Sequence, residues 1–115
     1  MRRDTDHLAD IIAAGRAIQS YAAGISRELF DEEPMRQDAV LRQITIIGEA
    51  VGRLSEDFRL AHAEIPWRDI IGMRNIVVHA YDRVDVDELW RVVHRDVADL
   101  LGSVTLLLPP RPDHR

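Results

Sequence analysis

The chain has no cysteine, no lysine and no long hydrophobic run among its 115 residues. Without cysteine it can form no disulfide, no thiolate nucleophile and no cysteine metal site. No apolar segment reaches the roughly 18 residues that a transmembrane helix needs. No apolar stretch follows the two arginines near the start of the chain, so we also expect no signal peptide. These absences predict a cytoplasmic protein.

The composition indicates one folded domain. Apolar residues make up 46% of the chain and charged residues 30%, which is ordinary for a globular protein and excludes a disordered or collagen-like chain. At this length we expect a single domain over residues 1–108, followed by a proline-rich tail over residues 109–115.

The charge is acidic. The 15 arginines are outnumbered by 20 aspartates and glutamates, which gives a net charge of −5. A protein that coats nucleic acid electrostatically is usually basic overall. Any contact with nucleic acid is therefore expected in a local cleft rather than over a whole face.

Apolar residues recur with the 3.6-residue period of an amphipathic helix through most of the chain. The pattern predicts helical segments at 8–29, 40–58, 67–78 and 86–107, with a connector around 55–66. This arrangement predicts an all-α fold, an antiparallel four-helix bundle in which a short additional helix carries the motif described below.

The sequence also predicts where helices begin and where two helices pack closely. The polar and proline residues expected at helix starts are Asp4 or Thr5, Pro34, Ser55, Pro66 and Asp85. Gly48 and Gly52 lie one turn apart inside the second segment, where each costs roughly 0.5–1 kcal/mol relative to alanine. They indicate a close approach by another helix, with a sequence accident as the alternative.

The segment Gly72–Asp82 departs from the helical pattern. It combines three consecutive β-branched residues, which are poor helix formers, with polar side chains that need partners or a purpose. Asn75 and His79 share a helical face, whereas Arg74 and His79 point about 140° apart on a straight helix. Two explanations remain open: the helix ends near His79, or two chains pool their motifs in one cleft.

The side chains of this segment suit cleavage of a phosphodiester. Histidine titrates near neutrality and can move a proton, and arginine can hold a phosphate and stabilise charge developing on it. An RNA 2′-hydroxyl that attacks its own phosphate needs only a base, an acid and a cation. The structural alternative is a hydrogen-bonded His79 near a helix end, with Arg74 in a salt bridge. We predict no metal site, because the remaining histidines share no metal-ligand spacing.

The sequence resembles a known family in several places at once. Residues 74–81, RNIVVHAY, match the pattern of arginine, four residues, histidine, any residue and tyrosine in HEPN-domain toxins of the HepT type. Residues 46–50, 65–73 and 83–85 are similar to that family's second helix, the approach to its motif and the residues after it. The resemblance covers residues 5–108, nearly the whole chain.

This resemblance implies a metal-independent ribonuclease without a cofactor, which acts on RNA as a dimeric toxin. The implied site consists of Arg74 and His79 as catalytic residues, Asn75 and Glu49 as supporting residues, and Tyr81 as an AMP acceptor. The family's antitoxin is a small nucleotidyltransferase that can transfer AMP to the motif tyrosine and so block the toxin. The sequence departs from many relatives at Ala80, where they carry glutamate.

Two other functions compete with the ribonuclease. The chain could be a non-catalytic HEPN module that binds a nucleotide or serves as the regulatory subunit of a nucleotidyltransferase, or a structural dimer without a ligand. The intact Arg74 and His79 favour the enzyme, since a binding module need not keep both. Outside the motif, Trp67 is predicted to anchor the core. Trp90 and His94, which lie one helical turn apart, are predicted to pack together.

Overall fold

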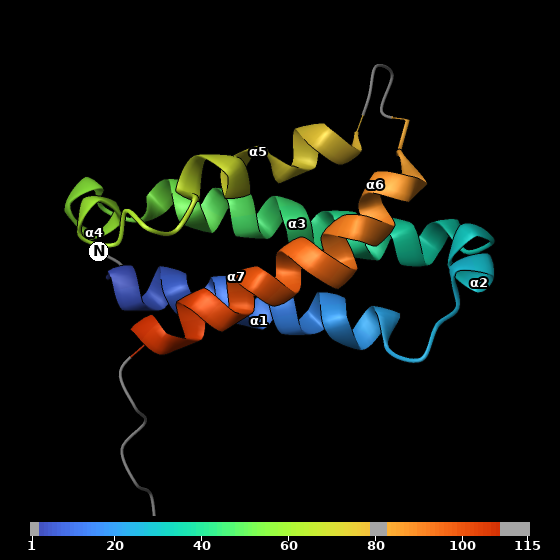
Figure 1. Ribbon diagram of the computed structural model, residues 1–115, viewed down its shortest axis with the longest axis horizontal. Helices are drawn as coiled ribbons and strands as arrows, with labels where there is room; N and C mark the ends of the chain where they lie inside the picture. The colour runs from blue at the N-terminus through green and yellow to red at the C-terminus, as the bar shows by residue number, and fades with distance from the viewer. Residues whose placement is uncertain (1–2, 79–82, 109–115) are drawn as a thin grey trace, which may run out of the picture.

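The computed structural model describes residues 3–78 and 83–108 and is built of helices (Figure 1). In chain order these are α1 (Asp4–Ala22), α2 (Arg27–Asp31), α3 (Pro34–Arg53), α4 (Glu56–Ala61), α5 (Trp67–Val77), α6 (Val86–Arg91), the π-helical turn η2 (Val92–Asp96), α7 (Val97–Val104) and the 3₁₀ turn η3 (Thr105–Leu107). The predicted all-α fold is confirmed over the described residues. None of the described helices is long and apolar enough to cross a membrane.

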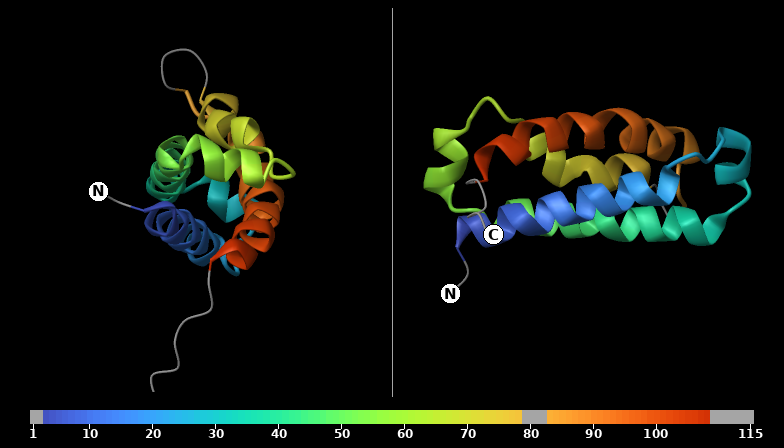
Figure 2. Two further views of the ribbon diagram at one scale, coloured as in Figure 1. Left: turned by 90° about the vertical axis from the view of Figure 1, so that its left-hand side faces the viewer. Right: turned by 90° about the horizontal axis from the view of Figure 1, so that it is seen from below.

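The longer helices lie side by side and alternate in direction. α1 packs on α3, and α3 packs on α5. The continuous C-terminal stretch from α6 through η2 to α7 packs on α1 and returns along it. The end-on view shows these helices around one centre, and the side view shows α2 and α4 at opposite ends (Figure 2).

The core is formed by the apolar stripes that the sequence predicts for the two longest helices. The buried members of these stripes on α1 and α3 are Leu8, Ile11, Gly15, Ile18, Ala22, Val40, Ile44, Ile47 and Val51. Fully burying one valine, leucine or isoleucine side chain is worth roughly 1.5–3 kcal/mol. A close approach occurs at Gly15, where a Cβ would lie 2.9 Å from Cδ2 of Leu101. Glycine at this position therefore lets α7 pack tightly on α1.

The first helix is shorter than predicted. The apolar stripe continues to Leu29, but α1 ends at Ala22 and the chain turns at Gly24, whose φ is +70°. Glycine adopts this left-handed conformation without steric cost. Ser26 then caps the separate helix α2, and Leu29 is 41% exposed. The prediction of one helix from 8 to 29 is therefore wrong at its C-terminal end.

Asp4 has a different role from the predicted helix cap. The N-cap of α1 is Arg3, which makes the prediction of Asp4 or Thr5 wrong. The Asp4 carboxylate instead accepts hydrogen bonds from the backbone N–H and the hydroxyl of Ser55, both at 2.7 Å. These two bonds lower the pKa of Asp4 and tie the start of α1 to the start of α4.

The connector predicted at 55–66 contains the short helix α4. Ser55 caps α4 as predicted, because its Oγ accepts a backbone N–H of the first turn at 3.1 Å. Gly48 lies beside α5, where a Cβ would meet the carbonyl oxygen of Ile71 at 3.5 Å. A Cβ on Gly52 would meet no described atom within 4 Å, so the predicted close approach is wrong for Gly52.

The C-terminal stretch begins as predicted and then departs from the expected period. Asp85 caps α6, since its side chain accepts a backbone N–H of the first turn at 3.1 Å. From Val92 to Asp96 the helix widens into η2. A π-helical turn holds more residues than an α-helical one, so it shifts the buried face. Leu89 and Val92 are fully buried although they lie outside the predicted stripe, whereas Trp90 is only partly buried.

Candidate functional site on α5

Trp67 anchors the start of α5, which confirms its predicted role in the core. Pro66 precedes the helix, and Trp67 is 7% exposed. The indole Nε1 donates hydrogen bonds to the carbonyl oxygens of Arg59 at 3.2 Å and His62 at 3.1 Å. The face of α5 that enters the core consists of Trp67, Ile70, Met73 and Val77. This burial decides which other side chains of α5 reach the surface.

Arg74 and Asn75 are among the exposed side chains, near the C-terminal end of α5. No carboxylate among the described residues forms an ion pair with Arg74. By contrast, Arg27 is held by Asp31 at 2.7 Å. A cation near the C-terminal end of a helix is also favoured by the helix dipole. The Arg74 guanidinium is therefore available to an anionic ligand.

Helix α5 ends at Val77, before the motif histidine. Val78 forms an antiparallel bridge with Val84, and the Asp85 N–H donates to the Val77 carbonyl oxygen at 2.7 Å. These contacts hold together the two ends of the segment 79–82, which itself lies outside the described residues. Because the helix stops here, the angle of about 140° expected on a straight helix does not apply. The first of the two sequence explanations, a helix that ends near the histidine, agrees with this geometry.

Among the described residues, Glu49 forms no ion pair with Arg74. His79 and Tyr81 lie outside the described residues. Glu49 lies on α3, where its carboxylate is 3.9 Å from the guanidinium of Arg53. The two side chains are 58% and 63% exposed, and such surface pairs contribute about 0–1 kcal/mol. The arginine that Glu49 contacts is thus Arg53 on its own helix.

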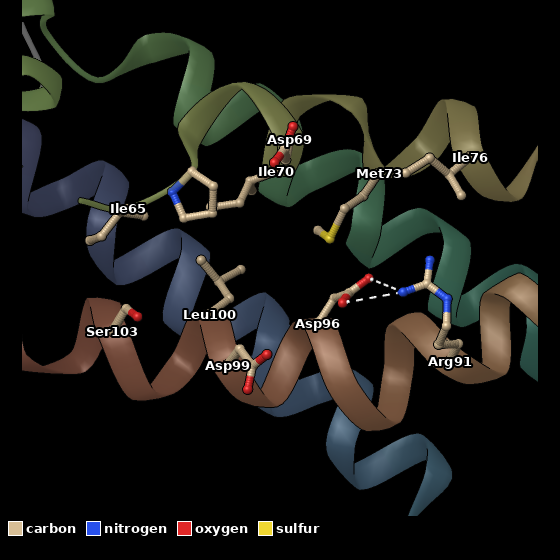
Figure 3. A pocket seen from close by; sticks show the side chains of 11 residues that line it. Ile65, Asp69, Ile70, Met73, Ile76, Arg91, Asp96, Asp99, Leu100 and Ser103 are labelled. Atoms are coloured by element: carbon tan, nitrogen blue, oxygen red, sulfur yellow. Dashed lines mark hydrogen bonds and ion pairs between the residues drawn. The ribbon is translucent and has the colours of Figure 1, made fainter. Parts of the chain in front are cut away.

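A groove of about 310 Å³ between α5 and the C-terminal stretch was not predicted from the sequence (Figure 3). Its lining includes the apolar side chains of Met73 and Leu100, with Asp69 on the α5 side and Asp99 on the α7 side. No local pattern could reveal it, because its two walls come from helices far apart in the sequence. Arg74 does not line the groove. The aspartates that do line it repel an anion, so a phosphate is disfavoured there.

The described part of the chain offers no metal centre. It contains no group of three or more histidines, aspartates and glutamates placed to hold a metal ion. Each described histidine has a different environment. His62 is 4.0 Å from Glu64, and the ring of His94 stacks on Trp90 with centroids 4.0 Å apart, which confirms the predicted packing. His7 is buried, and its Nδ1 has no hydrogen-bond partner among the described residues.

Comparison with known proteins shows which family the sequence matches. The family described as "Ribonuclease HepT-like" matches residues 11–105. A protein of Thermococcus cleftensis named "Probable ribonuclease HepT" is 41% identical over 89% of this chain and 93% of its own length. No solved structure matches significantly.

Two further relatives carry names that begin with "Putative RNase". The protein of Methanocaldococcus jannaschii is 32% identical over 87% of this chain and 92% of its own length. The protein of Caldanaerobacter subterraneus subsp. tengcongensis is 32% identical over 94% of this chain and 96% of its own length. The family match at residues 11–105 covers most of the helical domain, including the helix that carries Arg74.

Proposed function

The chain belongs to the HepT-like ribonuclease family, and we propose that it cleaves RNA at a site built from Arg74 and His79. Arg74 holds the scissile phosphate and stabilises the charge that develops on it. His79 moves the proton, as the base that takes it from the attacking 2′-hydroxyl or as the acid that gives one to the leaving oxygen. Asn75, which follows Arg74 in the sequence and is also exposed, is a supporting polar residue.

One observation carries this proposal. Arg74 is exposed at the end of α5 with no ion pair to a described residue, next to the bridge between Val78 and Val84. His79 follows Val78 directly in the sequence. Arg27, by contrast, is held by Asp31. A guanidinium that no described carboxylate holds, at the end of the helix that leads to a histidine in the sequence, supports a role in phosphate chemistry.

The proposed active unit is a homodimer that pools two motifs in one cleft. Ile71 is a large apolar side chain of α5 that is 42% exposed. It lies three residues before Arg74, so the two side chains are neighbours on the surface of the helix. A second copy that packs over this side of α5 would cover Ile71 and bring the two Arg74 side chains towards each other.

The reaction is tested by the ends that it leaves on RNA. We expect the purified protein to cleave RNA in the presence of EDTA and to leave a 2′,3′-cyclic phosphate, because the attacking group is the neighbouring 2′-hydroxyl. End mapping after digestion measures this product. Activity that EDTA abolishes and magnesium restores would contradict the proposed chemistry. An RNA with 2′-O-methyl groups is the control, since it lacks the nucleophile and should stay intact.

The proposed biological role is that of a toxin in a toxin–antitoxin pair, neutralised by a nucleotidyltransferase that adenylylates Tyr81. An AMP group at Tyr81 adds a negative charge to the motif, and in the proposed site this charge would compete with the RNA phosphate for Arg74. With ATP and the cognate nucleotidyltransferase, we expect the mass of the chain to rise by one or more AMP units on Tyr81. Tyr81→Phe should resist both this modification and the inhibition, as mass spectrometry and cleavage assays would measure. Full inhibition of Tyr81→Phe without a mass shift would mean that the antitoxin acts by occlusion.

A further inference from the structure

A ladder of aromatic rings leads from the core to the surface near the C-terminal end of α1. Phe30 is fully buried, and its ring centroid lies 5.3 Å from that of Trp90. The ring of His94 stacks on Trp90 in turn, with centroids 4.0 Å apart and planes tilted by 39°. His94 itself is exposed. The ladder therefore ends in an aromatic ring at the surface that is supported from below.

The orientation of the His94 ring is fixed by a hydrogen bond as well as by the stack. Its Nδ1 lies 3.0 Å from the carbonyl oxygen of Trp90. A carbonyl oxygen only accepts, so Nδ1 is the donor and Nε2 is left for another partner. His94 lies in the middle of the π-helical turn η2, and π-helical turns occur frequently at functional sites. A surface ring held by two contacts loses little freedom when a ligand stacks on it.

The ring borders a shallow hollow of about 350 Å³ between α1 and the C-terminal stretch. Small residues leave this space open, and the lining consists of Gln19, Ala22, Ala23, Gly24, Val93, His94 and Ala98. The Gln19 side chain makes no hydrogen bond to a described residue, so its amide can both donate and accept. The hollow thus combines a stacking surface with one free hydrogen-bonding group.

The charge of this hollow differs from that of two other hollows among the described residues. Its lining contains no carboxylate. The groove beside α5 has Asp69 and Asp99 in its lining, and the hollow at the start of α3 has Glu32 and Glu33. On a protein with a net charge of −5, a surface without carboxylates is a place where a polyanion can lie. Arg95, which follows His94 in the sequence, is exposed and forms no ion pair with a described residue.

We propose that the hollow beside His94 binds a base of single-stranded RNA, which stacks on the His94 ring while Gln19 contacts its edge. Unpaired bases of RNA are commonly held by stacking on aromatic side chains and by hydrogen bonds to their edges. This inference rests on the proposed function, because it assigns the base to the substrate RNA. The site lies outside the motif and extends the contact with the substrate.

The path between this hollow and the motif is short enough for one RNA strand. His94 comes eight residues after Val86, which begins α6 beside the bridge between Val78 and Val84. Eight residues of helix span about 12 Å along the helix axis. This axial distance corresponds to roughly four nucleotides at the 3.4 Å spacing of stacked bases. Arg91 and Asp96 line the groove that faces α5, whereas His94 lines the hollow that faces α1. A strand that contacts both Arg74 and His94 therefore also passes around the C-terminal stretch and spans more than four nucleotides.

The test measures binding of a fluorescent RNA of about twelve nucleotides, with 2′-O-methyl groups so that it is not cut. We expect His94→Ala to weaken binding by roughly five- to ten-fold, in the lower range for loss of one stacked base. His94→Phe keeps the ring and should bind within about two-fold of the wild type. The matched control is His62→Ala, because His62 also stacks on an aromatic ring, Phe58 at 4.6 Å, but beside Glu64 at the α4 end of the molecule.

Three further measurements use an RNA without bases, free AMP and thermal unfolding. They distinguish stacking of an RNA base on His94 from other causes of weaker binding. With an RNA that lacks bases, the difference between wild type and His94→Ala should disappear. Equal binding by His94→Ala and wild type would overturn the inference, and so would a free AMP that binds the hollow as tightly as the RNA does. Thermal unfolding checks that His94→Ala is folded, as its exposed position predicts. Cleavage of unmodified RNA by the wild type tests the proposed function separately, since base binding at His94 does not depend on whether the RNA is cut.

Discussion

Replacing Arg74 by alanine should lower the rate of RNA cleavage by about 10²–10³-fold, the usual cost of removing one group that stabilises transition-state charge. The fold should remain intact, because Arg74 is exposed and forms no ion pair with a described residue. Arg74→Lys should recover only part of the loss. Lysine keeps the charge but cannot bind a phosphate with two parallel hydrogen bonds. Initial rates on a defined RNA, with circular dichroism for the fold, measure the effect.

Arg68→Ala is the matched control for this experiment. Arg68 is also an exposed arginine of α5 without an ion pair to a described residue. It lies six residues before Arg74, which on an α-helix is about 120° away around the axis. A general loss of positive charge would affect both variants, whereas a specific phosphate contact affects Arg74→Ala alone. Equal cleavage rates for Arg74→Ala and Arg68→Ala would contradict the proposed role of Arg74 in binding the phosphate.

A mixture of two inactive variants should regain activity if the site is shared between two chains. Arg74→Ala chains keep His79, and His79→Ala chains keep Arg74, while each variant alone should lose about 10²-fold or more. A mixed dimer then has one Arg74 and one His79 on opposite chains. If these residues act across the interface, denaturing and refolding the two variants together should restore about a quarter of the wild-type rate, given random pairing.

The same mixture distinguishes the two explanations that the sequence leaves open. If Arg74 and His79 act within one chain, no chain in the mixture carries both and the rate stays at the level of the single variants. The control is the double variant Arg74→Ala/His79→Ala mixed with either single variant, which should stay inactive under both explanations. Light scattering of the wild type at micromolar concentration checks that a dimer is present. A monomer with full activity would exclude the shared site.

Much of the local structure could be predicted because it depends on nearby residues. The caps at Ser55 and Asp85 are set by a side-chain oxygen that reaches a backbone N–H three residues later. Proline at the start of α3 fits a position where no N–H is needed. The buried stripes on α1 and α3 follow from the helical period alone.

The errors arose where distant residues decide the outcome. Asp4 is a suitable helix cap by sequence, but the two hydrogen bonds from Ser55, 51 residues away, use its carboxylate instead. Gly48 and Gly52 look equivalent in sequence, yet only at Gly48 does the backbone of α5 come near. The widening of the helix at η2 also has no local signal, and it changes which side chains of the C-terminal stretch face the core.

The sequence by itself determined the all-α fold and the residues of the motif, because helical periodicity and the order of side chains along a chain are local properties. It also placed Arg74 near the end of a helix. The tertiary structure decided that α5 stops at Val77, because the bridge between Val78 and Val84 takes the chain out of the helix. It also brought Gln19 and Ala22 of α1 beside His94, where they line a hollow without carboxylates. The walls of this hollow are far apart in the sequence, and only packing brings such segments together.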